Sequence, residues 1–522
     1  MTQLQPGGTV GVVGVGTMGS GIAQTATLAG HPVVMVDAVP GRADDAVRAV
    51  RGQLDRLAAR GRLEEPVALA AGSRLTAADD LTALAGASLV IEAAAESLEV
   101  KNSLFATLES IVSQDCVLAT NTSSLSVSAI AAPLRRPGRL VGMHFFNPAQ
   151  VMRLVEVISG LDTDPRVAEW VAGTARAWGK VPIQVASTPG FVVNRVARPF
   201  YGEALRALEE RAGDPATLDA VMRESGGFRM GPLELTDLIG QDVNQAANRS
   251  VWEAFGHDPR YAPSLAQRQL VDAGRLGRKS GRGFYVHDGS PPPSPATAAA
   301  SPAPAEVIVE GDWGPWEPLW ERLAGTGIAV RRATDSPAGS ATAGPAATAP
   351  SPAGAVARMD QVLLVPTSGR TATQEAVERG RPTVVLDLAR DPATTARWAV
   401  AASDGCPPAA LAEAIGMLQA CGAEVTVLDD VPGLLVARTA AMLVNEAADV
   451  AGRGVADAAA VDAAMELGAN HPQGPLTWGD AIGARRLVEL LDTVGAHHGD
   501  GRYRACSTLR RAALTGRPLR TL

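Results

Sequence analysis

Short apolar runs alternate with stretches of helical periodicity through the first third of the chain. The runs are rich in Val, Leu and Ile and carry few polar residues, which is typical of strands buried on both faces of a parallel sheet. Strand–helix alternation of this kind predicts an α/β fold with a doubly wound Rossmann sheet. From Pro189 onward the periodicity is helical and predicts an all-α domain. The predicted strands are Thr9–Gly14, Pro32–Asp37, Ser88–Ala94, Cys116–Asn121 and Arg139–Phe145.

The helical pattern repeats itself. The stretch from Pro189 to Gly240 recurs from Pro432 to Gly483 at a constant offset of 243 residues and without a gap. The matches keep the same offset through a Gly-Pro-Leu turn. Chance similarity between two helices would not keep one offset through a turn. The sequence therefore predicts a second copy of the all-α domain. Between the copies, residues 306–430 again alternate strand and helix and predict a reduced α/β segment without a glycine-rich fingerprint.

Two segments rich in Pro, Ser and Ala have no periodicity and almost no charge, and they predict linkers that are mobile. They separate or interrupt the predicted domains. The predicted organisation is an NAD-binding Rossmann domain over 1–187, a helical substrate and dimerisation-type domain over 188–288, a disordered linker over 289–305, the reduced α/β segment over 306–430 with a flexible insertion at 336–355, and the second helical domain over 431–522.

Composition narrows the function classes. The 522 residues carry 47 Lys and Arg against 55 Asp and Glu, a net charge of −8, which argues against nucleic acid as the main ligand. The four cysteines form no C-x-x-C pair, so a structural metal site or a disulfide framework is not expected. No apolar run approaches the length of a membrane span. We therefore expect a cytoplasmic protein with no membrane partner.

A glycine-rich motif follows the first strand and opens a helix. Gly14 allows a tight turn, Gly16 lets backbone amides approach a pyrophosphate, and Gly19 lets helix and strand pack closely. The next strand ends in Asp37, about 20 residues on, where a carboxylate can bind ribose hydroxyls. This combination predicts dinucleotide binding, with NAD favoured over NADP because Asp37 repels a 2′-phosphate. The nearby Arg42 weakens that preference.

The second motif is Gly-Met-His-Phe-Phe-Asn-Pro, which places His144 where a strand gives way to a loop. A histidine can take the proton of an alcohol while hydride leaves the adjacent carbon, and a carboxylate partner fixes its tautomer. Glu156 lies on a following strand that can return beside it. A buried core histidine is the alternative, but Asn147 and the preceding Rossmann module favour catalysis.

Other polar residues complete the candidate site. Ser123, just after a strand, can bind a substrate oxygen or cap a helix, and Asn194 can line the site or link helices. Glu96 and Lys101 fall in the predicted helix after the strand Ser88–Ala94, near the nicotinamide half of the cofactor. A basic set on the helix after Asp37 either holds a polyphosphate such as coenzyme A or is a solvated face. Its members are Arg48, Arg51, Arg56, Arg60 and Arg62.

With these motifs the chain resembles the L-3-hydroxyacyl-CoA dehydrogenases. The resemblance is to the long form found among the 3-hydroxybutyryl-CoA and 3-hydroxyadipyl-CoA dehydrogenases of phenylacetate catabolism. The motifs occur in family order over nearly all of residues 8–286, and the second helical copy resembles the family's second C-terminal domain. The carrying motifs are GVGTMGSGIAQ, IEAAAESLEVK, NTSSLSVSAIA, GMHFFNPAQVMRLVEV, TPGFVVNRV, GPLELTDLIG and GRKSGRGFY.

The resemblance implies roles for these residues. His144 is expected to be the catalytic acid and base, with Glu156 as its partner. The second copy has Ala437 where the first has Asn194 and no His-Phe-Phe-Asn-Pro motif precedes it, so one active site per chain is expected. The remaining implied roles are binding of the substrate 3-oxygen by Ser123, Asn147 and Asn194, binding of NAD by Gly14, Gly16, Gly19 and Asp37, and contact with the nicotinamide ribose by Glu96 and Lys101.

The function expected from sequence is reversible NAD-dependent oxidation of an (S)-3-hydroxyacyl-CoA, without a metal, in fatty-acid or aromatic catabolism. The alternatives are a dehydrogenase of a hydroxy acid without coenzyme A and a non-catalytic NAD-binding scaffold. Acyl chain length stays open, because Arg153 and Arg198 can hold a terminal carboxylate or lie on the surface. The repeat suggests an intrachain pseudo-dimer of the helical domains, which leaves further homo-oligomerisation open.

Overall fold

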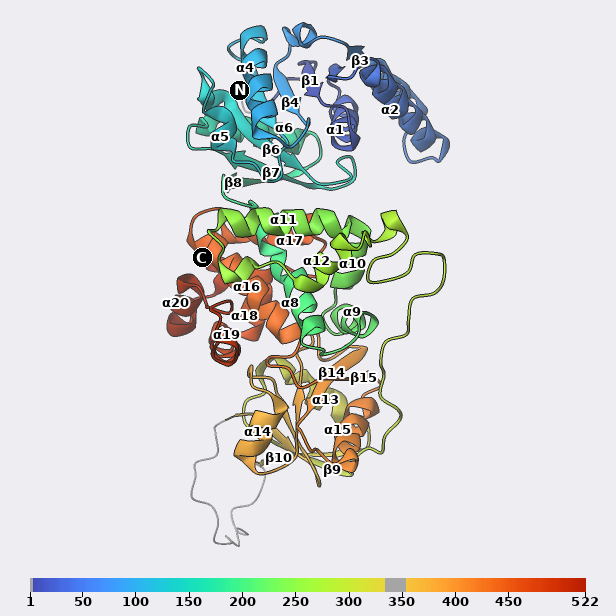
Figure 1. The fold of residues 1–522 in the computed structure, drawn as a ribbon, viewed down its shortest axis with the longest axis vertical. Coiled ribbons are helices and arrows are strands. Elements are labelled where there is room, and N and C mark those ends of the chain that lie inside the picture. The colour runs from blue at the N-terminus through green and yellow to red at the C-terminus, as the bar shows by residue number, and fades with distance from the viewer. Residues whose placement is uncertain (1–2, 334–353) are drawn as a thin grey trace. The chain divides into compact units, whose positions relative to one another are not determined.

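The computed structural model describes residues 3–333 and 354–522, so most of the predicted insertion at 336–355 lies outside the described residues (Figure 1). The described chain forms two compact units. The first comprises residues 1–195 and 450–469, and the second comprises 196–449 and 470–522. The predicted boundaries differ from this division, because a segment inside the predicted second helical domain belongs to the first unit. Burial against a sheet, which local sequence does not encode, decides that membership.

The first unit contains an eight-stranded sheet with the order β3-β2-β1-β4-β5-β6-β7-β8. All neighbours are parallel except β6 and β7, which are antiparallel. The Rossmann fold expected from the sequence is thereby confirmed. Strands β3 and β8 are absent from the sequence prediction because they are half-exposed edge strands without a continuous apolar run. The strands are β1 Val10–Val13, β2 Val33–Val36, β3 Leu75–Ala78, β4 Leu89–Glu92, β5 Val117–Thr120, β6 Leu140–Phe145, β7 Leu154–Ser159 and β8 Val181–Ala186.

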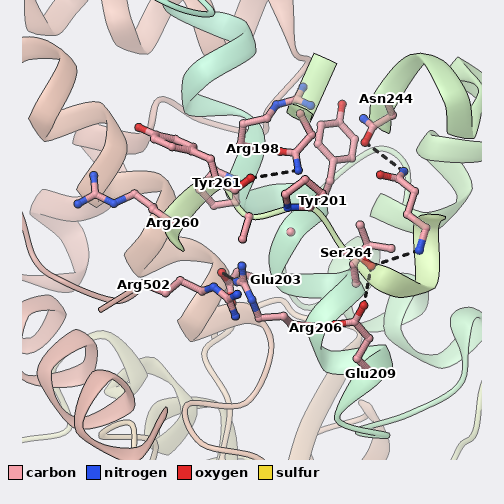
Figure 2. Close-up of a pocket in the computed structure, with 17 residues that line it drawn as sticks. Arg198, Tyr201, Glu203, Arg206, Glu209, Asn244, Arg260, Tyr261, Ser264 and Arg502 are labelled. Carbon is pink, nitrogen blue, oxygen red and sulfur yellow. Dashed lines mark hydrogen bonds and ion pairs between the residues drawn. The ribbon is translucent and has the colours of Figure 1, made fainter. Parts of the chain in front are cut away.

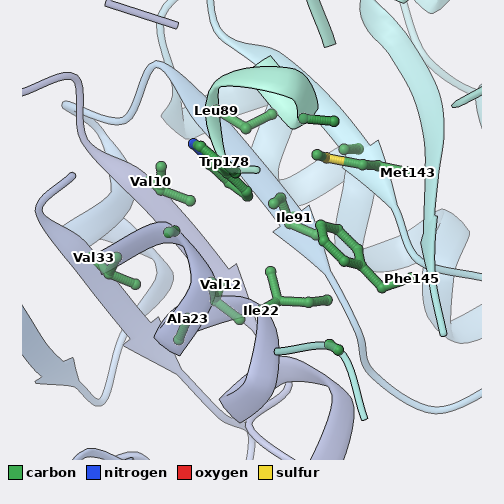
Figure 3. Packing of buried hydrophobic residues seen from close by; sticks show 14 of the residues in the cluster. Val10, Val12, Ile22, Ala23, Val33, Leu89, Ile91, Met143, Phe145 and Trp178 are labelled. Carbon is green, nitrogen blue, oxygen red and sulfur yellow. The ribbon is translucent and has the colours of Figure 1, made fainter. Parts of the chain in front are cut away.

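Helices connect these strands and bury their apolar faces against the sheet. Figure 3 shows Val12 of β1 beside Ile22 of α1, with Phe145 of β6 and Trp178 in the same cluster. Each of these side chains is buried, and fully burying such a side chain contributes about 1.5–3 kcal/mol. The cluster fixes the carboxyl ends of β1, β4 and β6, where the candidate site lies. The helices are α1 Thr17–Leu28, α2 Arg42–Ala59, α3 Glu65–Ser73, α4 Leu98–Ile111, α5 Val127–Ala131 and α6 Pro165–Ala177.

The second unit holds the repeated helices and a second sheet. The first helical copy contains α7 Val193–Val196, which begins in the first unit, then α8 Arg198–Glu209, α9 Pro215–Glu224, α10 Pro232–Ile239, α11 Gln241–Ala254 and α12 Leu265–Asp272. The second helical copy contains α16 Val436–Gly452, α17 Ala458–Gly468, α18 Pro475–Ile482, α19 Ala484–His498 and α20 Ser507–Thr515, of which α17 belongs to the first unit.

The second sheet has seven strands in the order β10-β9-β11-β12-β13-β14-β15. The reduced α/β segment expected over 306–430 is present among the described residues. The strands are β9 Glu306–Glu310, β10 Ala329–Arg332, β11 Val356–Arg358, β12 Leu363–Pro366, β13 Thr383–Leu386, β14 Arg397–Ala402 and β15 Glu424–Leu428. The helices between them are α13 Pro318–Ala324, α14 Ala372–Arg379 and α15 Pro408–Ala420.

The segment 289–305, expected to be a disordered linker, is irregular but is held by specific hydrogen bonds. The amide of Ala298 donates to the carbonyl of Val425 on β15 over 2.8 Å, and the amide of Ser301 donates to Gln419 of α15 over 2.9 Å. The segment thus makes specific hydrogen bonds where its composition predicts a disordered linker. Backbone hydrogen bonds to an edge strand need no apolar side chains, so composition alone misses them.

Within the second unit the two helical copies exchange polar contacts reciprocally. The hydroxyl of Tyr261 in the first copy donates to Glu446 in the second over 2.6 Å, and the hydroxyl of Tyr503 in the second donates to Glu203 in the first over 2.9 Å. Glu203 and Glu446 occupy matching positions of the 243-residue repeat. Figure 2 shows the small pocket at this seam, with Tyr261 and Glu203 among its lining residues.

Burial alone raises the pKa of Glu203, but the neighbouring Arg206 and Arg438 outweigh it and lower the pKa. Both guanidinium groups are within ion-pair distance of this carboxylate. A charged carboxylate is therefore retained in the core of the seam, where an unpaired charge would be strongly destabilising.

Candidate active site

The centre of the candidate site is a histidine–carboxylate pair on two antiparallel strands. His144 on β6 lies directly opposite Glu156 on β7 in the strand register. The Nδ1 atom of His144 lies 2.7 Å from Oε2 of Glu156, and both side chains are buried. A carboxylate at Nδ1 favours the tautomer with the proton on Nδ1, which leaves Nε2 as the proton acceptor. The two residues that the sequence analysis pairs are thus in contact.

Glu156 also anchors the turn that follows the sheet. Its second oxygen, Oε1, accepts hydrogen bonds from the amides of Val192 and Val193 over 3.0 and 3.1 Å. Those amides immediately precede Asn194, so the same carboxylate fixes His144 and the backbone next to Asn194. Two oxygens that each have protein donors leave Glu156 little freedom to rotate.

Aromatic rings pack around the imidazole. The ring of Phe146 lies 4.6 Å from that of His144 between centroids, and the ring of Phe191 lies 5.8 Å away. The side-chain oxygen of Asn121 accepts a hydrogen bond from the amide of Phe145 over 2.8 Å, which ties the end of β5 to the strand that carries the histidine. Asn121 is thus a supporting residue that the sequence analysis does not select, although it stands in the selected motif.

The turn that contains Ser123 is organised by Glu96. One oxygen of Glu96, Oε1, accepts hydrogen bonds from the hydroxyl of Thr122 and from the amides of Ser123 and Ser124. Burial alone raises the pKa of Glu96, but the bond from Thr122 and the charge of Lys101 outweigh it and lower the pKa. Glu96 lies in the turn before α4 rather than on the predicted helix, which begins at Leu98.

Lys101 on α4 is buried and forms ion pairs with two carboxylates. Its Nζ lies 2.5 Å from Glu92 at the end of β4 and 3.3 Å from Glu96. Glu92, fully buried, also accepts a hydrogen bond from Thr120 on β5 over 2.7 Å. Lys101 therefore acts on the site through carboxylates. The sequence analysis misses Glu92, because a lone acid in an apolar strand gives no signal until its buried partner is known.

The glycine motif forms a tight turn between β1 and α1. Gly14 has φ +89°, and a Cβ on Gly19 would lie 1.8 Å from the carbonyl oxygen of Gly14. The space beside Gly16 is open, and α1 begins there without a side-chain cap, so its first amides can bind an anion. Asp37 at the end of β2 accepts hydrogen bonds from the amides of Val15 and Val39. This donor set fits a dinucleotide.

Two further candidates are exposed. Asn147 follows β6 three residues after His144, and Arg60 lies just past the end of α2. Of the basic set around Arg60, Arg51 is exposed as well, and its guanidinium donates hydrogen bonds to the carbonyls of Gly72 and Leu75. Arg42 lies 3.9 Å from Asp37, as an exposed partner of that carboxylate.

The strand registers extend the repeat beyond the helices. Strands β13 and β14 pair antiparallel, as β6 and β7 do, and β14 and β15 pair parallel, as β7 and β8 do. At the same 243-residue offset, Asp387 occupies the position of His144 and Ala399 that of Glu156. The amides of Leu435 and Val436 donate to Asp387. They match those of Val192 and Val193, which donate to Glu156.

The second sheet also has a cleft of about 850 Å³ at the carboxyl end of β12. Thr367 and Ser368 line it at the place that corresponds to Thr122 and Ser123, and Ala437 lines it in place of Asn194. The second sheet therefore has a crevice but lacks the imidazole, its carboxylate partner and the asparagine.

Comparisons with known proteins agree with this division. Residues 9–188 match the model of the 3-hydroxyacyl-CoA dehydrogenase NAD binding domain, and residues 190–287 and 433–521 both match its C-terminal domain. The chain belongs to the 3-hydroxyacyl-CoA dehydrogenase family. It is an NAD-dependent enzyme of this family. Residues 364–432 match the reduced Rossmann-fold domain of 3-hydroxybutyryl-CoA dehydrogenase.

Relatives of two lengths are similar to this dehydrogenase. The 3-hydroxyadipyl-CoA dehydrogenase of Escherichia coli (strain K12) is 43% identical over 97% of both chains. A probable 3-hydroxybutyryl-CoA dehydrogenase of Bacillus subtilis (strain 168) is 42% identical. The match covers 53% of this chain and 96% of the length of that relative. A crystal structure titled 3-hydroxybutyryl-CoA dehydrogenase from Escherichia coli K12 superposes with a TM-score of 0.86 at 41% identity, over 98% of this chain and 99% of that one.

Two negative findings apply to the described residues. No cluster of three or more His, Cys, Asp and Glu side chains there is arranged to hold a metal ion. In the same part of the chain, every helix is too short or too polar to cross a lipid bilayer.

Proposed function

We propose that the enzyme oxidises an (S)-3-hydroxyacyl-CoA reversibly to the 3-oxoacyl-CoA through a dyad of His144 and Glu156. The observation that carries the proposal is the 2.7 Å contact between Nδ1 of His144 and Oε2 of Glu156 at the end of the Rossmann sheet. General acid–base catalysis by a positioned histidine contributes about 10²–10⁴-fold to rate. A dyad of this kind fits an alcohol–ketone interconversion without a metal.

In the proposed mechanism His144 removes the proton of the 3-hydroxyl group at Nε2. The Nδ1 proton stays hydrogen bonded to Glu156, whose charge stabilises the imidazolium that forms. NAD, which Gly14, Gly16, Gly19 and Asp37 would hold, would supply the acceptor for the hydride from C3 of the substrate. In the reverse direction the imidazolium of His144 returns this proton to the ketone oxygen as hydride is delivered to C3.

The other polar residues are assigned supporting roles. Ser123, Asn147 and Asn194 are proposed to bind the 3-oxygen as charge develops on it. Glu96 and Lys101 are proposed to act near the nicotinamide ribose, with Glu96 holding the turn of Ser123. Further groups are proposed to bind the ends of the ligands: Gly14, Gly16, Gly19 and Asp37 the dinucleotide, and Arg60 the phosphates of coenzyme A.

The acyl group is proposed to be short, either 3-hydroxyadipyl or 3-hydroxybutyryl, within fatty-acid or phenylacetate catabolism. The similarity to relatives with those printed names supports this choice. Arg153 and Arg198 stay candidates for a terminal carboxylate. The alternative that Arg198 lies on the surface is wrong, because this residue is buried against the ring of Tyr201. A panel of kcat/KM values for 3-hydroxybutyryl-CoA, 3-hydroxyadipyl-CoA and longer thioesters, with NAD and NADP, separates the possibilities.

The decisive test of the dyad is His144→Ala and Glu156→Gln. We expect His144→Ala to lower kcat by about 10³-fold while NADH binding, followed by its fluorescence, changes less than about two-fold. Turnover of a free 3-hydroxy acid at the rate of the thioester, with no competition by coenzyme A, would favour the alternative substrate class. Near-normal turnover by His144→Ala would refute the dyad.

We also propose that the two helical copies form a pseudo-dimer within the chain. The reciprocal contacts of Tyr261 with Glu446 and of Tyr503 with Glu203 support this, since a self-complementary interface repeats each contact across its two-fold axis. Further self-association and a cytoplasmic location stay predictions from the sequence.

A further inference from the structure

Helix α17 of the second helical copy packs on the catalytic sheet. It contacts β7 and β8 in the first unit, with Val461, Ala464 and Met465 among its buried residues. The segment before it is tied to the sheet, because the amide of Ala186 at the end of β8 donates to the carbonyl of Val455 over 2.8 Å. A segment that follows β8 by more than 260 residues is therefore part of the catalytic unit.

The opposite copy makes the equivalent contact in the second unit. Helix α9 of the first copy packs on β14, and the amide of Asp429 donates to the carbonyl of Ala212 over 3.0 Å. Asp429 and Ala212 match Ala186 and Val455 at the 243-residue offset. Each sheet is thus covered by a helix of the other copy. The contact of α17 with the first sheet therefore recurs at the matching place in the second sheet.

The last residue of α17 is Gly468. Its φ is not positive, and the helix ends at Ala469 in an ordinary conformation, so backbone geometry does not require glycine here. Close approach of a neighbour is the remaining reason for a glycine at this position. A Cβ on Gly468 would lie 2.6 Å from Cδ2 of Leu154 and 3.0 Å from Cγ2 of Val193.

Those neighbours are the supports of the dyad. Leu154 precedes Glu156 by two residues on β7, and the amide of Val193 donates to Glu156. The third neighbour is Phe146, whose Cε1 would lie 3.7 Å from the added Cβ and whose ring packs on His144. One position on α17 therefore touches the surroundings of both members of the dyad.

The matching position in the other copy differs. Residue Ser225 stands at the end of α9, and its hydroxyl donates to the carbonyl of Arg397 over 2.8 Å. Arg397 corresponds to Leu154 in the strand register. The second sheet, which has no dyad, accommodates the side chain of Ser225 at this position. The first sheet, which carries the dyad, has Gly468 there.

We infer that Gly468 is a positioning residue for the reaction, contributed to the active site by the second helical copy. Its missing side chain lets α17 hold Phe146 and Leu154 in the places that fix the imidazole. The inference rests on the proposed function of the dyad. It assigns to the C-terminal half a direct effect on turnover beyond its contribution to folding.

The test compares Gly468→Val with the parent chain and with Gly202→Val. Gly202 is a helical glycine on α8 at which a Cβ would meet nothing within 4 Å, so it is the matched control. We expect Gly468→Val to lower kcat about ten-fold or more, because small displacements of catalytic groups are costly, with KM and NADH binding changed less than about two-fold. Gly202→Val is expected to keep the parent kcat.

A compensating variant separates positioning from folding. Leu154→Ala removes the side chain that the added valine would strike first, so Gly468→Val with Leu154→Ala should recover at least about half of the lost kcat in logarithmic terms. Parent-like kcat in Gly468→Val, parallel loss of NADH binding, or failure of this rescue would each overturn the inference. Absence of dehydrogenase activity in the parent chain itself would instead refute the proposed function.

Discussion

The two sheets of this chain share an antiparallel–parallel strand pattern at one edge but place their carboxylates differently. In the first sheet Glu156 on β7 holds both His144 and the amides of the following turn. In the second sheet Asp387, at the position of the histidine, holds the matching amides without an imidazole. A carboxylate that anchors the helical domain to the sheet is therefore retained in both halves. The proposed chemistry adds a histidine and places the carboxylate on the neighbouring strand.

The largest expected difference between the halves is catalytic. Alanine at His144 should lower kcat by about 10³-fold, or about 4 kcal/mol of transition-state stabilisation, whereas Asp387→Ala should leave kcat within about two-fold at a temperature where it is folded. Steady-state assays of both variants provide the comparison. A comparable loss of kcat in Asp387→Ala would show that the second sheet takes part in catalysis.

Asp387→Ala should instead lower stability. It leaves the buried amides of Leu435, Val436 and Ala437 without their acceptor, at about 1–3 kcal/mol for each unsatisfied group, so we expect a loss of about 3 kcal/mol or more. Urea unfolding followed by tryptophan fluorescence measures it. The control is Asp391→Ala, whose carboxylate lies in an exposed turn of the same segment. Equal stability of the two variants would contradict the anchoring role.

The same carboxylate predicts a pH dependence. Burial raises the pKa of Asp387 to about 6, against the opposing effect of the amides that donate to it. Because the folded pKa exceeds the unfolded value of 3.8, its contribution to stability is complete below about pH 3.8 and is lost as pH rises through about 6. The change corresponds to about 3 kcal/mol.

Asp387→Asn keeps an acceptor and removes the titration. The difference in unfolding free energy between the parent and this variant should therefore fall between pH 4 and pH 7, as measured by denaturant titration at each pH. A difference that stays constant over this range would show that Asp387 does not titrate there.

The smallest expected effect concerns the helical turn. Asn194→Ala gives the first copy the residue found at Ala437 in the second. We expect kcat/KM to fall about ten-fold, or about 1.4 kcal/mol, because one proposed donor to the 3-oxygen is lost while the dyad stays intact. Asn248→Ala, on α11 of the second unit, serves as the control. Unchanged kcat/KM in Asn194→Ala would remove it from the proposed substrate contacts.

Much of the fold could be predicted from local patterns. The glycine motif and the buried strands β1, β2, β4, β5 and β6 follow from residue types within a few positions of each other, and the 243-residue repeat is visible in register. His144 and Glu156 could be paired because two consecutive strands joined by a short loop run antiparallel, which brings these two positions opposite each other. These features depend on short separations along the chain.

Local sequence patterns were enough to predict the Rossmann module, the duplication and the histidine with its acid. The folded chain was needed to show that α17 belongs to the first unit, that Lys101 is buried between Glu92 and Glu96, and that Asp387 takes the anchoring role of Glu156 in the second sheet. Each of these depends on which distant group supplies a hydrogen bond or apolar cover after burial. The free energy of burying a polar or charged group depends on its partner in the folded chain, and the spacing of residues along the sequence does not identify that partner.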